Sequence, residues 1–164
     1  MAIVLARVDN RLVHGQILST WVPALGADVL VVLDDEAAEN DLAKSAMEIA
    51  VPPGLDLVVD RVARALETVD ALPESARAIV LVRGIEEAQR ALSAGLPVTR
   101  LNLGNIHFAP DRRPVSQSVY LSPDEVRRLA AIEAAGVTVE LKTLPRDAAV
   151  GLEEIRRRAM GTTA

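Results

Sequence analysis

Short, uninterrupted runs of apolar residues recur along this chain, and segments of helical character separate them. The two clearest runs are DVLVVL at residues 28–33 and AIVLV at residues 78–82. A strand that is buried on both faces has this pattern, because neither of its faces meets water. Half of the residues are apolar, and only Trp21, Phe108 and Tyr120 are aromatic. A core built mainly of Ala, Val and Leu is typical of a parallel sheet covered by helices.

The order of the predicted elements is regular over most of the chain. The pattern predicts strands over residues 2–8, 28–33, 56–59, 78–82, 98–103, 116–121 and 137–143. It predicts helices over residues 15–25, 36–49, 63–69, 85–94, 122 to about 135, and 151–160. Strands that alternate with helices form βαβ units. We therefore expect an α/β fold: a single-domain open, mostly parallel sheet of about seven strands, with helices on both faces.

Three local features refine this expectation. Residues 103–116 contain no convincing helix, so the fifth and sixth strands are joined by a loop. We expect the sixth strand to run antiparallel or to lie at a sheet edge, because a parallel connection needs a longer crossover. Pro23 lacks an N–H group and should kink or end the first helix. Ser122 and Glu125 form a capping box that starts the helix after the sixth strand.

Charge and residue content exclude several classes of function. Lys and Arg total 18 against 23 Asp and Glu, and a domain with a net charge of −5 binds nucleic-acid backbones poorly. The absence of cysteine excludes disulfides and thiolate metal sites, and two separated histidines give weak support for a metal. Neither a G-x-G-x-x-G fingerprint nor a Walker A sequence is present. No signal peptide or membrane-length apolar run occurs, so we expect one cytoplasmic domain over residues 1–164.

The turn from Asp9 to Gln16 is the main candidate site. It lies where the first strand should end and the first helix should begin, and it contains Asp9, Arg11 and His14. In open α/β sheets, ligands gather at the carboxyl ends of strands. A neutral imidazole is a good nucleophile near pH 7, and a phosphoryl group is one acceptor that suits it.

Groups that could hold such a phosphoryl group lie in the same turn. Arg11 offers a fork of N–H donors, and the backbone N–H groups of Gly15, Gln16 and Ile17 would open the following helix. Asp9 could orient Arg11, or it could hydrogen-bond the imidazole of His14 and so set its tautomer. The alternative interpretation is that His14 only caps the helix or makes a partly buried polar contact.

Other candidate residues carry weaker signals. Asp34, Asp35 and Glu36 follow the second strand and either cap the next helix or line the same edge of the sheet. Gly104 and Asn105 follow the fifth strand and could turn close to His14. His107 is better explained as a loop residue than as a second nucleophile. Two arginine clusters are either solvated or face an acidic protein partner, namely Arg112-Arg113 and Arg156-Arg157-Arg158.

In the turn that contains His14, and in several later stretches, the chain resembles a known family, the IIB component of the mannose/fructose/sorbose-type bacterial phosphotransferase system. The resemblance rests on residues 7–16 (RVDNRLVHGQ) with Trp21 shortly after them. It continues through residues 31–36 (VVLDDE), 51–54 (VPPG) and 101–105 (LNLGN) and covers nearly the whole chain. Family members often have an acidic residue in place of Asn10 and a glycine in place of Asn105.

The resemblance implies a phosphocarrier enzyme of the N(pi)-phosphohistidine–sugar phosphotransferase type. His14 would take a phosphoryl group from phospho-IIA and pass it to a sugar that the membrane subunits IIC and IID translocate. Arg11, with Gly15 and Gln16, would bind the phosphoryl group. The residues in supporting positions would be Asp9, Asn10, Asp35 and Asn105. No metal or organic cofactor is expected, and a peripheral position at the inner face of the membrane would follow from contact with IIC and IID.

Two alternatives remain open at this stage. The same fold and the same His14 chemistry could report phosphorylation state to a partner protein without any transfer to sugar. A non-enzymatic α/β domain could hold phosphate at the His14 turn without a covalent bond. A homo-oligomer is also open, with contacts through residues 116–121, the preceding loop or the C-terminal helix. The sugar is not specified, because the membrane subunits would largely select it.

Overall fold

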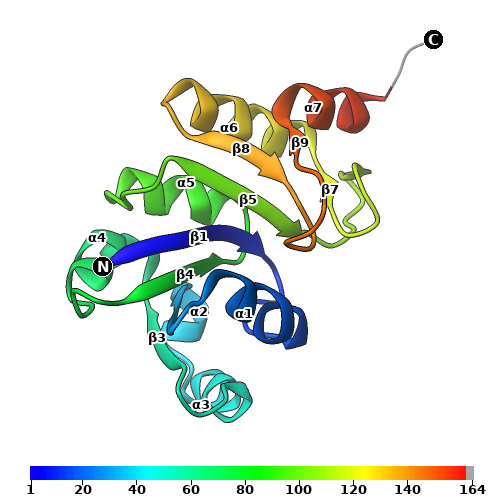
Figure 1. The fold of residues 1–164 in the computed structure, drawn as a ribbon. Helices are drawn as coiled ribbons and strands as arrows, with labels where there is room; N and C mark the ends of the chain where they lie inside the picture. Colours follow the sequence, from blue (N-terminus) through cyan, green and yellow to red (C-terminus); the bar gives the residue numbers. More distant parts are fainter. Residues whose placement is uncertain (162–164) are drawn as a thin grey trace.

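Seven strands form the central sheet of the computed structural model, which describes residues 1–161 (Figure 1). Their order is β3-β2-β4-β1-β5-β8-β9, and all neighbours are parallel except β8 and β9. The strands are β1 (Ala2–Asp9), β2 (Val29–Leu33), β3 (Asp56–Asp60), β4 (Arg77–Val82), β5 (Arg100–Asn105), β8 (Thr138–Leu141) and β9 (Val150–Gly151). The expected open, mostly parallel α/β sheet is confirmed.

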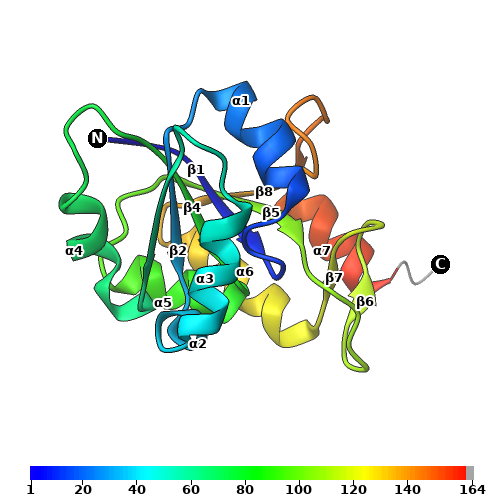
Figure 2. The ribbon, with the colours of Figure 1, turned by 90° about the horizontal axis from the view of Figure 1, so that it is seen from below.

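Helices cover both faces of this sheet (Figure 2). One face packs on α4 (Ala65–Asp70), α5 (Ile85–Ser93), α6 (Pro123–Ala134) and α7 (Leu152–Met160). The other packs on η1 (Ile17–Trp21), α1 (Val22–Leu25) and α3 (Asp41–Ala50). Along β4, Ala78 and Val80 belong to the first core while Ile79 and Leu81 belong to the second. Successive strand residues point to opposite faces, which explains why this strand is apolar throughout.

The first helix passes Pro23 by widening its turn. The structure is helical from Gly15, and within η1 the Val22 N–H donates to the carbonyl of Ile17, five residues back. Pro23 cannot donate an ordinary helical hydrogen bond, so the expected interruption takes the form of this π-helical segment. The helix then ends at Leu25, and Gly26 follows with φ +61°.

The predicted helix over residues 36–49 is wrong as a single helix. The structure contains α2 (Asp35–Ala38) and α3, and Asn40 separates them. The Asn40 side chain accepts a hydrogen bond from the Ala43 N–H and so caps α3, a role for which asparagine is favoured over an interior helical position. The helix predicted over residues 63–69 begins with a short 3₁₀ turn, η2 (Val62–Arg64), before α4.

The predicted strand over residues 116–121 is too long, because residues 116–118 form bends and Val119 makes only an isolated bridge with Ile106. Only β7 (Tyr120–Leu121) is extended, and it pairs antiparallel with β6 (Arg113–Pro114) outside the main sheet. The Ser116 hydroxyl accepts hydrogen bonds from the N–H groups of Ser118 and Val119, so a local turn replaces the ladder. The antiparallel edge strand of the main sheet is instead β9, which lies where the sequence predicts the start of the last helix.

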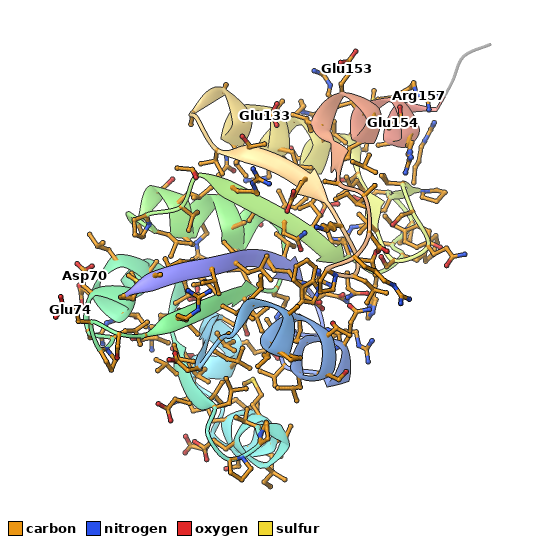
Figure 3. All side chains as sticks on the ribbon, viewed as in Figure 1. Asp70, Glu74, Glu133, Glu153, Glu154 and Arg157 are labelled. Atoms are coloured by element: carbon orange, nitrogen blue, oxygen red, sulfur yellow. The ribbon has the colours of Figure 1, made fainter. Side chains whose placement is uncertain are left out.

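Charged side chains occupy the outer surface of the helical layer. Figure 3 labels six of them around the end of α4 and on α6 and α7: Asp70, Glu74, Glu133, Glu153, Glu154 and Arg157. All six are on the outside of the molecule in this view, although the Glu133 carboxylate reaches back to accept a hydrogen bond from the Val139 N–H in β8. Over residues 1–161, no helix has both the length and the apolar character needed to cross a membrane.

Candidate functional site

The turn after β1 is organised by the carboxylate of Asp9, the last residue of the strand. Asp9 is fully buried, and its Oδ1 accepts a hydrogen bond from the Arg11 N–H at 3.1 Å. The Leu12 N–H donates to the Asp9 carbonyl, and the Asn10 N–H donates to the carbonyl of Asn105 at the end of β5. These bonds join the turn to the neighbouring strand, so its shape is fixed by the sheet as well as by local sequence.

Leu12 has an unusual backbone conformation within this turn. Its φ is +56°, and it is the only residue other than glycine with a positive φ in residues 1–161. Its side chain is buried in the core beneath η1, and that packing offsets the strain of the left-handed conformation. Leu12 lies two positions before His14, so its left-handed backbone conformation determines the direction of the chain at His14 and the side on which the imidazole lies.

His14 is bonded to Asp9 through one ring nitrogen. Nε2 lies 2.9 Å from Asp9 Oδ2, and only 7% of the histidine side chain is exposed. An ionised carboxylate can only accept a hydrogen bond, so the neutral ring holds its proton on Nε2 and its lone pair on Nδ1. Nδ1 is buried and has no hydrogen-bond partner within the described residues. The site thus presents an imidazole with one nitrogen anchored and the other free.

Asp9 remains ionised despite its burial. Burial raises the pKa of the Asp9 carboxyl, but hydrogen bonds from His14 and Asn105 and the charge of Arg7 outweigh it and hold the pKa below its ordinary value. The Asn105 amide donates to Asp9 Oδ2 at 2.9 Å, and Arg7 Nε donates to the same oxygen at 3.2 Å. A carboxylate with several donors keeps its negative charge in a dry site.

Arg7 lies beneath this carboxylate and is completely buried. Its guanidinium also donates to the Gln16 side chain at 2.9 Å, to the Asn102 side chain at 2.9 Å and to the carbonyl of Lys142 at 3.0 Å. It stacks 5.2 Å from the centre of the Trp21 ring. Burial lowers the pKa of Arg7, Asp9 offsets part of this effect, and the guanidinium stays charged.

A bulge in β5 makes room for this arginine. Val8 pairs with Leu103 but Asp9 pairs with Asn105, so Gly104 is the extra residue. A Cβ at Gly104 would lie 2.0 Å from the Arg7 Cζ, which is far inside van der Waals contact. Gly104 therefore leaves space for the guanidinium, and the shift in register directs the Asn105 side chain to Asp9 and, at 3.2 Å, to Gln16.

The structure brings most of the predicted site residues together. Asp9, His14, Gln16 and Asn105 share one hydrogen-bond network, although Gln16 joins it through its side chain and not only its backbone. Arg11 is exposed, and no ion pair or side-chain hydrogen bond engages its guanidinium within residues 1–161.

Gly15 and Asn10 lie at the rim of this network. Gly15 is exposed, with open space around its Cα. The Asn10 Oδ1 is buried without a partner in the described part of the chain. The Leu18 N–H bonds the His14 carbonyl, which leaves the earlier N–H groups of the helix directed at the turn.

Asp35 lies apart from this network. Its carboxylate accepts from the Val62 N–H at 2.9 Å and from Arg90 at 2.8 Å. These two hydrogen bonds lower the pKa of Asp35. Its neighbour Asp34 caps α2 and pairs with Arg83. Both residues follow β2, and β4 lies between β2 and β1 in the sheet.

The remaining histidine and the arginine clusters also lie outside the network. His107 is exposed in its loop. Arg112 pairs with Glu125, and Arg157 and Arg158 pair with Glu154 on α7. Among residues 1–161, no group of three or more His, Asp or Glu side chains is arranged to hold a metal ion.

Arg7 and Asn102 were not predicted as site residues, although both lie in the stretches that carry the resemblance. One signal for each is visible in the sequence. Arg7 interrupts the run IVLARV, and Asn102 interrupts LNL, at positions where a strand of a parallel sheet is normally apolar. A charged or amide side chain in such a strand must find buried partners, so these two positions predict a polar network within the core.

Known proteins of similar sequence belong to one family. The family model described as PTS system sorbose subfamily IIB component matches residues 3–163, where PTS stands for phosphotransferase system. The fructose-specific EIIB component of Bacillus subtilis is 29% identical over 160 residues, which cover 96% of this chain and 97% of that protein. The N-acetylgalactosamine-specific enzyme IIB component 1 of Escherichia coli is 29% identical over 146 residues, covering 88% and 92%.

A solved structure gives the same result for the fold. The crystal structure of manxB from Thermoanaerobacter tengcongensis superposes with a TM-score of 0.86, at 33% identity and 95% coverage of each chain. The two curated relatives act on different sugars by name yet are equally similar to this chain, so identity does not select a sugar. With the family model spanning almost every residue, the chain belongs to the sorbose subfamily of IIB components and is a phosphotransferase component of a bacterial sugar phosphotransferase system.

Proposed function

We propose that His14 is the phosphoryl carrier of this IIB component and that Nδ1 is the atom that carries the group. The observation behind this proposal is that the two ring nitrogens differ: Nε2 lies 2.9 Å from the Asp9 carboxylate, and Nδ1 has no hydrogen-bond partner within the described residues. In the neutral ring this tautomer leaves the lone pair on Nδ1, as a nucleophile requires.

Two transfers then complete the reaction. The Nδ1 lone pair attacks the phosphorus of a phosphohistidine on a IIA partner; the new N–P bond forms as the donor N–P bond breaks, and the donor imidazole leaves. A sugar hydroxyl later attacks the same phosphorus and gives its proton to solvent; the new O–P bond forms as the His14 N–P bond breaks, and the neutral imidazole leaves. Little covalent chemistry falls to the protein, so positioning and charge stabilisation provide the catalysis.

The phosphoryl group carries negative charge, and the turn offers donors for it. Arg11 is exposed and free of ion pairs in the described residues, and the N–H groups that open the helix at Gly15 and Gln16 face the same turn. Nδ1 is buried in this conformation. Access for a donor therefore requires the imidazole or the exposed backbone at Gly15 to shift when IIA docks.

The partners in this proposal are a phospho-IIA protein or domain, the membrane subunits IIC and IID, and a sugar. The chain works as a single IIB domain over residues 1–164, on the cytoplasmic side, where IIC and IID recruit it. The test is to supply phosphoenolpyruvate, enzyme I, HPr and a panel of IIA proteins, and then vesicles containing IIC and IID with a set of sugars. We expect acid-labile phosphate on the protein, followed by its discharge onto one of the sugars.

Failure at either stage separates this proposal from its alternatives. A protein that accepts phosphate but discharges it to no sugar would support a regulatory role with the same His14 chemistry. A protein that binds inorganic phosphate but never forms a covalent adduct would be an anion-binding domain. Either result would contradict the transport function.

Replacing Arg11 with alanine should slow transfer from phospho-IIA about 10- to 100-fold. A charge-assisted hydrogen bond contributes about 1.5–3 kcal/mol, and each 1.36 kcal/mol is about tenfold in rate. Thermal stability should be unchanged, because the side chain is exposed and unpaired within residues 1–161. Arg156→Ala on α7 removes the same charge from another exposed position and serves as the control. Equal rates for the two variants would remove Arg11 from the mechanism.

A further inference from the structure

We propose that Arg7 is a positioning residue for phosphotransfer: through Asp9 it holds the imidazole of His14 with Nδ1 as the free nitrogen, and Gly104 keeps the space that its guanidinium needs. The inference rests on the proposed role of His14. Arg7 itself is fully buried and does not reach the reacting atoms, so its effect is transmitted through the carboxylate.

Arg7 ties together four parts of the chain that meet at the site. Its four hydrogen bonds run to Asp9, to Gln16 in the first helix, to Asn102 in β5 and to the carbonyl of Lys142 after β8. Most donors of its planar fork are therefore used, and each points in a different direction. A rigid fork with partners in β1, in β5 and directly after β8 fixes the position of Asp9 relative to the sheet.

The first helix is also held at Arg7, through its residues Gln16 and Trp21. The Trp21 ring lies against the Arg7 guanidinium at 5.2 Å, and its indole N–H donates to the carbonyl of Thr143 at 3.0 Å. Gln16 accepts from Arg7 and also from Asn105. The helix that begins directly after His14 is thus anchored to the loop after β8 through Arg7 and Trp21.

The Asp9 carboxylate is shared in a way that favours orientation of the imidazole. Oδ2 receives the Arg7, Asn105 and His14 donors, and Oδ1 receives the Arg11 N–H. Donors on both oxygens stop the carboxylate from rotating, so the only direction left for the His14 N–H is the observed one. Displacement of the guanidinium would leave Oδ2 with the Asn105 and His14 donors alone and would remove the charge beneath it, so the carboxylate could move away from the imidazole, which would then populate both tautomers.

Gly104→Ala tests this idea without changing any charge. The new Cβ would fall on the guanidinium, 2.0 Å from Cζ and 2.2 Å from Nε, and would push Arg7 out of its place beneath Asp9. Gly151→Ala is the matched control, because no heavy atom lies within 4 Å of its Cβ position and its φ is −80°. Arg7→Lys is the second variant, which keeps the positive charge but loses the fork.

Two readouts separate positioning from simple destabilisation. The maximal rate of transfer from phospho-IIA should fall about 100-fold in Gly104→Ala, as small misplacements of reacting groups can cost, while the half-saturating donor concentration stays the same. Nitrogen NMR of ¹⁵N-histidine-labelled protein should show one Nε2–H tautomer for His14 in the wild type and a mixture in Gly104→Ala. His107 is exposed and provides an internal reference whose signals should not move.

Arg7→Lys should show the same loss of rate and the same mixed tautomer, and it keeps the inference testable if Gly104→Ala does not fold. The inference is overturned if either folded variant keeps the wild-type tautomer and the rate of Gly151→Ala, even with a lowered melting temperature. If wild-type protein itself takes no phosphate, the proposed function fails first, and the tautomer measurement still decides whether Arg7 positions His14.

Discussion

Replacing His14 with alanine is expected to abolish phosphorylation of this protein by phospho-IIA. Among the described side chains at the end of β1, the imidazole has the nitrogen lone pair that is free to attack: Asp9 has donors on both carboxylate oxygens, the side chains of Gln16 and Asn105 are engaged in the same network, and the unpartnered Oδ1 of Asn10 is a weakly nucleophilic amide oxygen. Without the nucleophile no covalent intermediate forms, so the loss should be complete and not a matter of rate. Acid-labile label measured after a long incubation with the full donor chain checks this.

The chain offers a matched control for this experiment. His107 is the other of its two histidines, and it is exposed in the loop after β5. His107→Ala should take up label as the wild type does. Label that persists on His14→Ala and disappears from His107→Ala would place the carrier in that loop. Label that survives in the double variant His14→Ala/His107→Ala would exclude phosphohistidine, because the chain has two histidines.

Asp9→Asn should reduce both the transfer rate and the stability of the fold. A neutral amide no longer fixes the His14 tautomer, and correct protonation by a positioned group is worth about 10²–10⁴-fold. The same change leaves the buried Arg7 guanidinium without its counter-charge, and breaking a buried ion pair costs about 3–5 kcal/mol. Phosphotransfer kinetics and urea unfolding at neutral pH measure the two effects. Asp35 follows β2, and its carboxylate pairs with Arg90. Asp35→Asn should leave the transfer rate unchanged.

The loss of stability in Asp9→Asn should also depend on pH. The pKa of Asp9 is lowered in the folded protein from an ordinary value of 3.8. The ionised carboxylate therefore stabilises the fold at pH values above 3.8, and this contribution is lost as the pH falls through the lower, folded-state pKa. The difference in unfolding free energy between wild type and Asp9→Asn should be full at pH 7 and shrink at acid pH. A difference that stays constant down to pH 3 would mean that Asp9 is not ionised in the network.

The fold could be predicted from the sequence where one kind of interaction dominates. Strands β2 and β4 are buried on both faces, so burial alone determines their sequences and the apolar runs identify them. Residues 116–121 look similar, but the Ser116 hydroxyl binds two backbone N–H groups and closes a turn there. Asn40 divides the second helix by the same kind of local hydrogen bond. Hydrogen bonds from side chains to the backbone compete with helices and strands, and the spacing of apolar residues does not reveal them.

In the candidate site, too, contacts between residues close in the sequence can be predicted, and contacts between distant strands cannot. Asp9 and His14 are five residues apart in one turn, so the sequence offers their contact as one of two possible roles for Asp9, the other being orientation of Arg11. Arg7 meets Asn102 across 95 positions and the carbonyl of Lys142 across 135, through the pairing of β1, β5 and β8. That pairing, and the bulge at Gly104, are set by the order of strands in the sheet and not by local sequence.

Asp35 shows the opposite case. It follows a strand on the predicted edge of the sheet, yet β4 lies between β2 and β1 and separates Asp35 from the turn that holds His14. Its carboxylate is used by Val62 and Arg90 instead. The order of strands in the sequence does not tell which strand ends become neighbours in the sheet. The sequence therefore predicts the correct edge of the sheet for Asp35 but not its separation from His14.

The most direct test of the central claim is to find the atom that carries the phosphoryl group. Wild-type protein is charged through phosphoenolpyruvate, enzyme I, HPr and IIA, its intact mass is measured, and phosphorus and nitrogen NMR locate the bond. The geometry at Asp9 predicts one acid-labile phosphoryl group per chain, on Nδ1 of His14. Phosphate on Nε2, on any other residue, or no covalent phosphate at all would contradict the account.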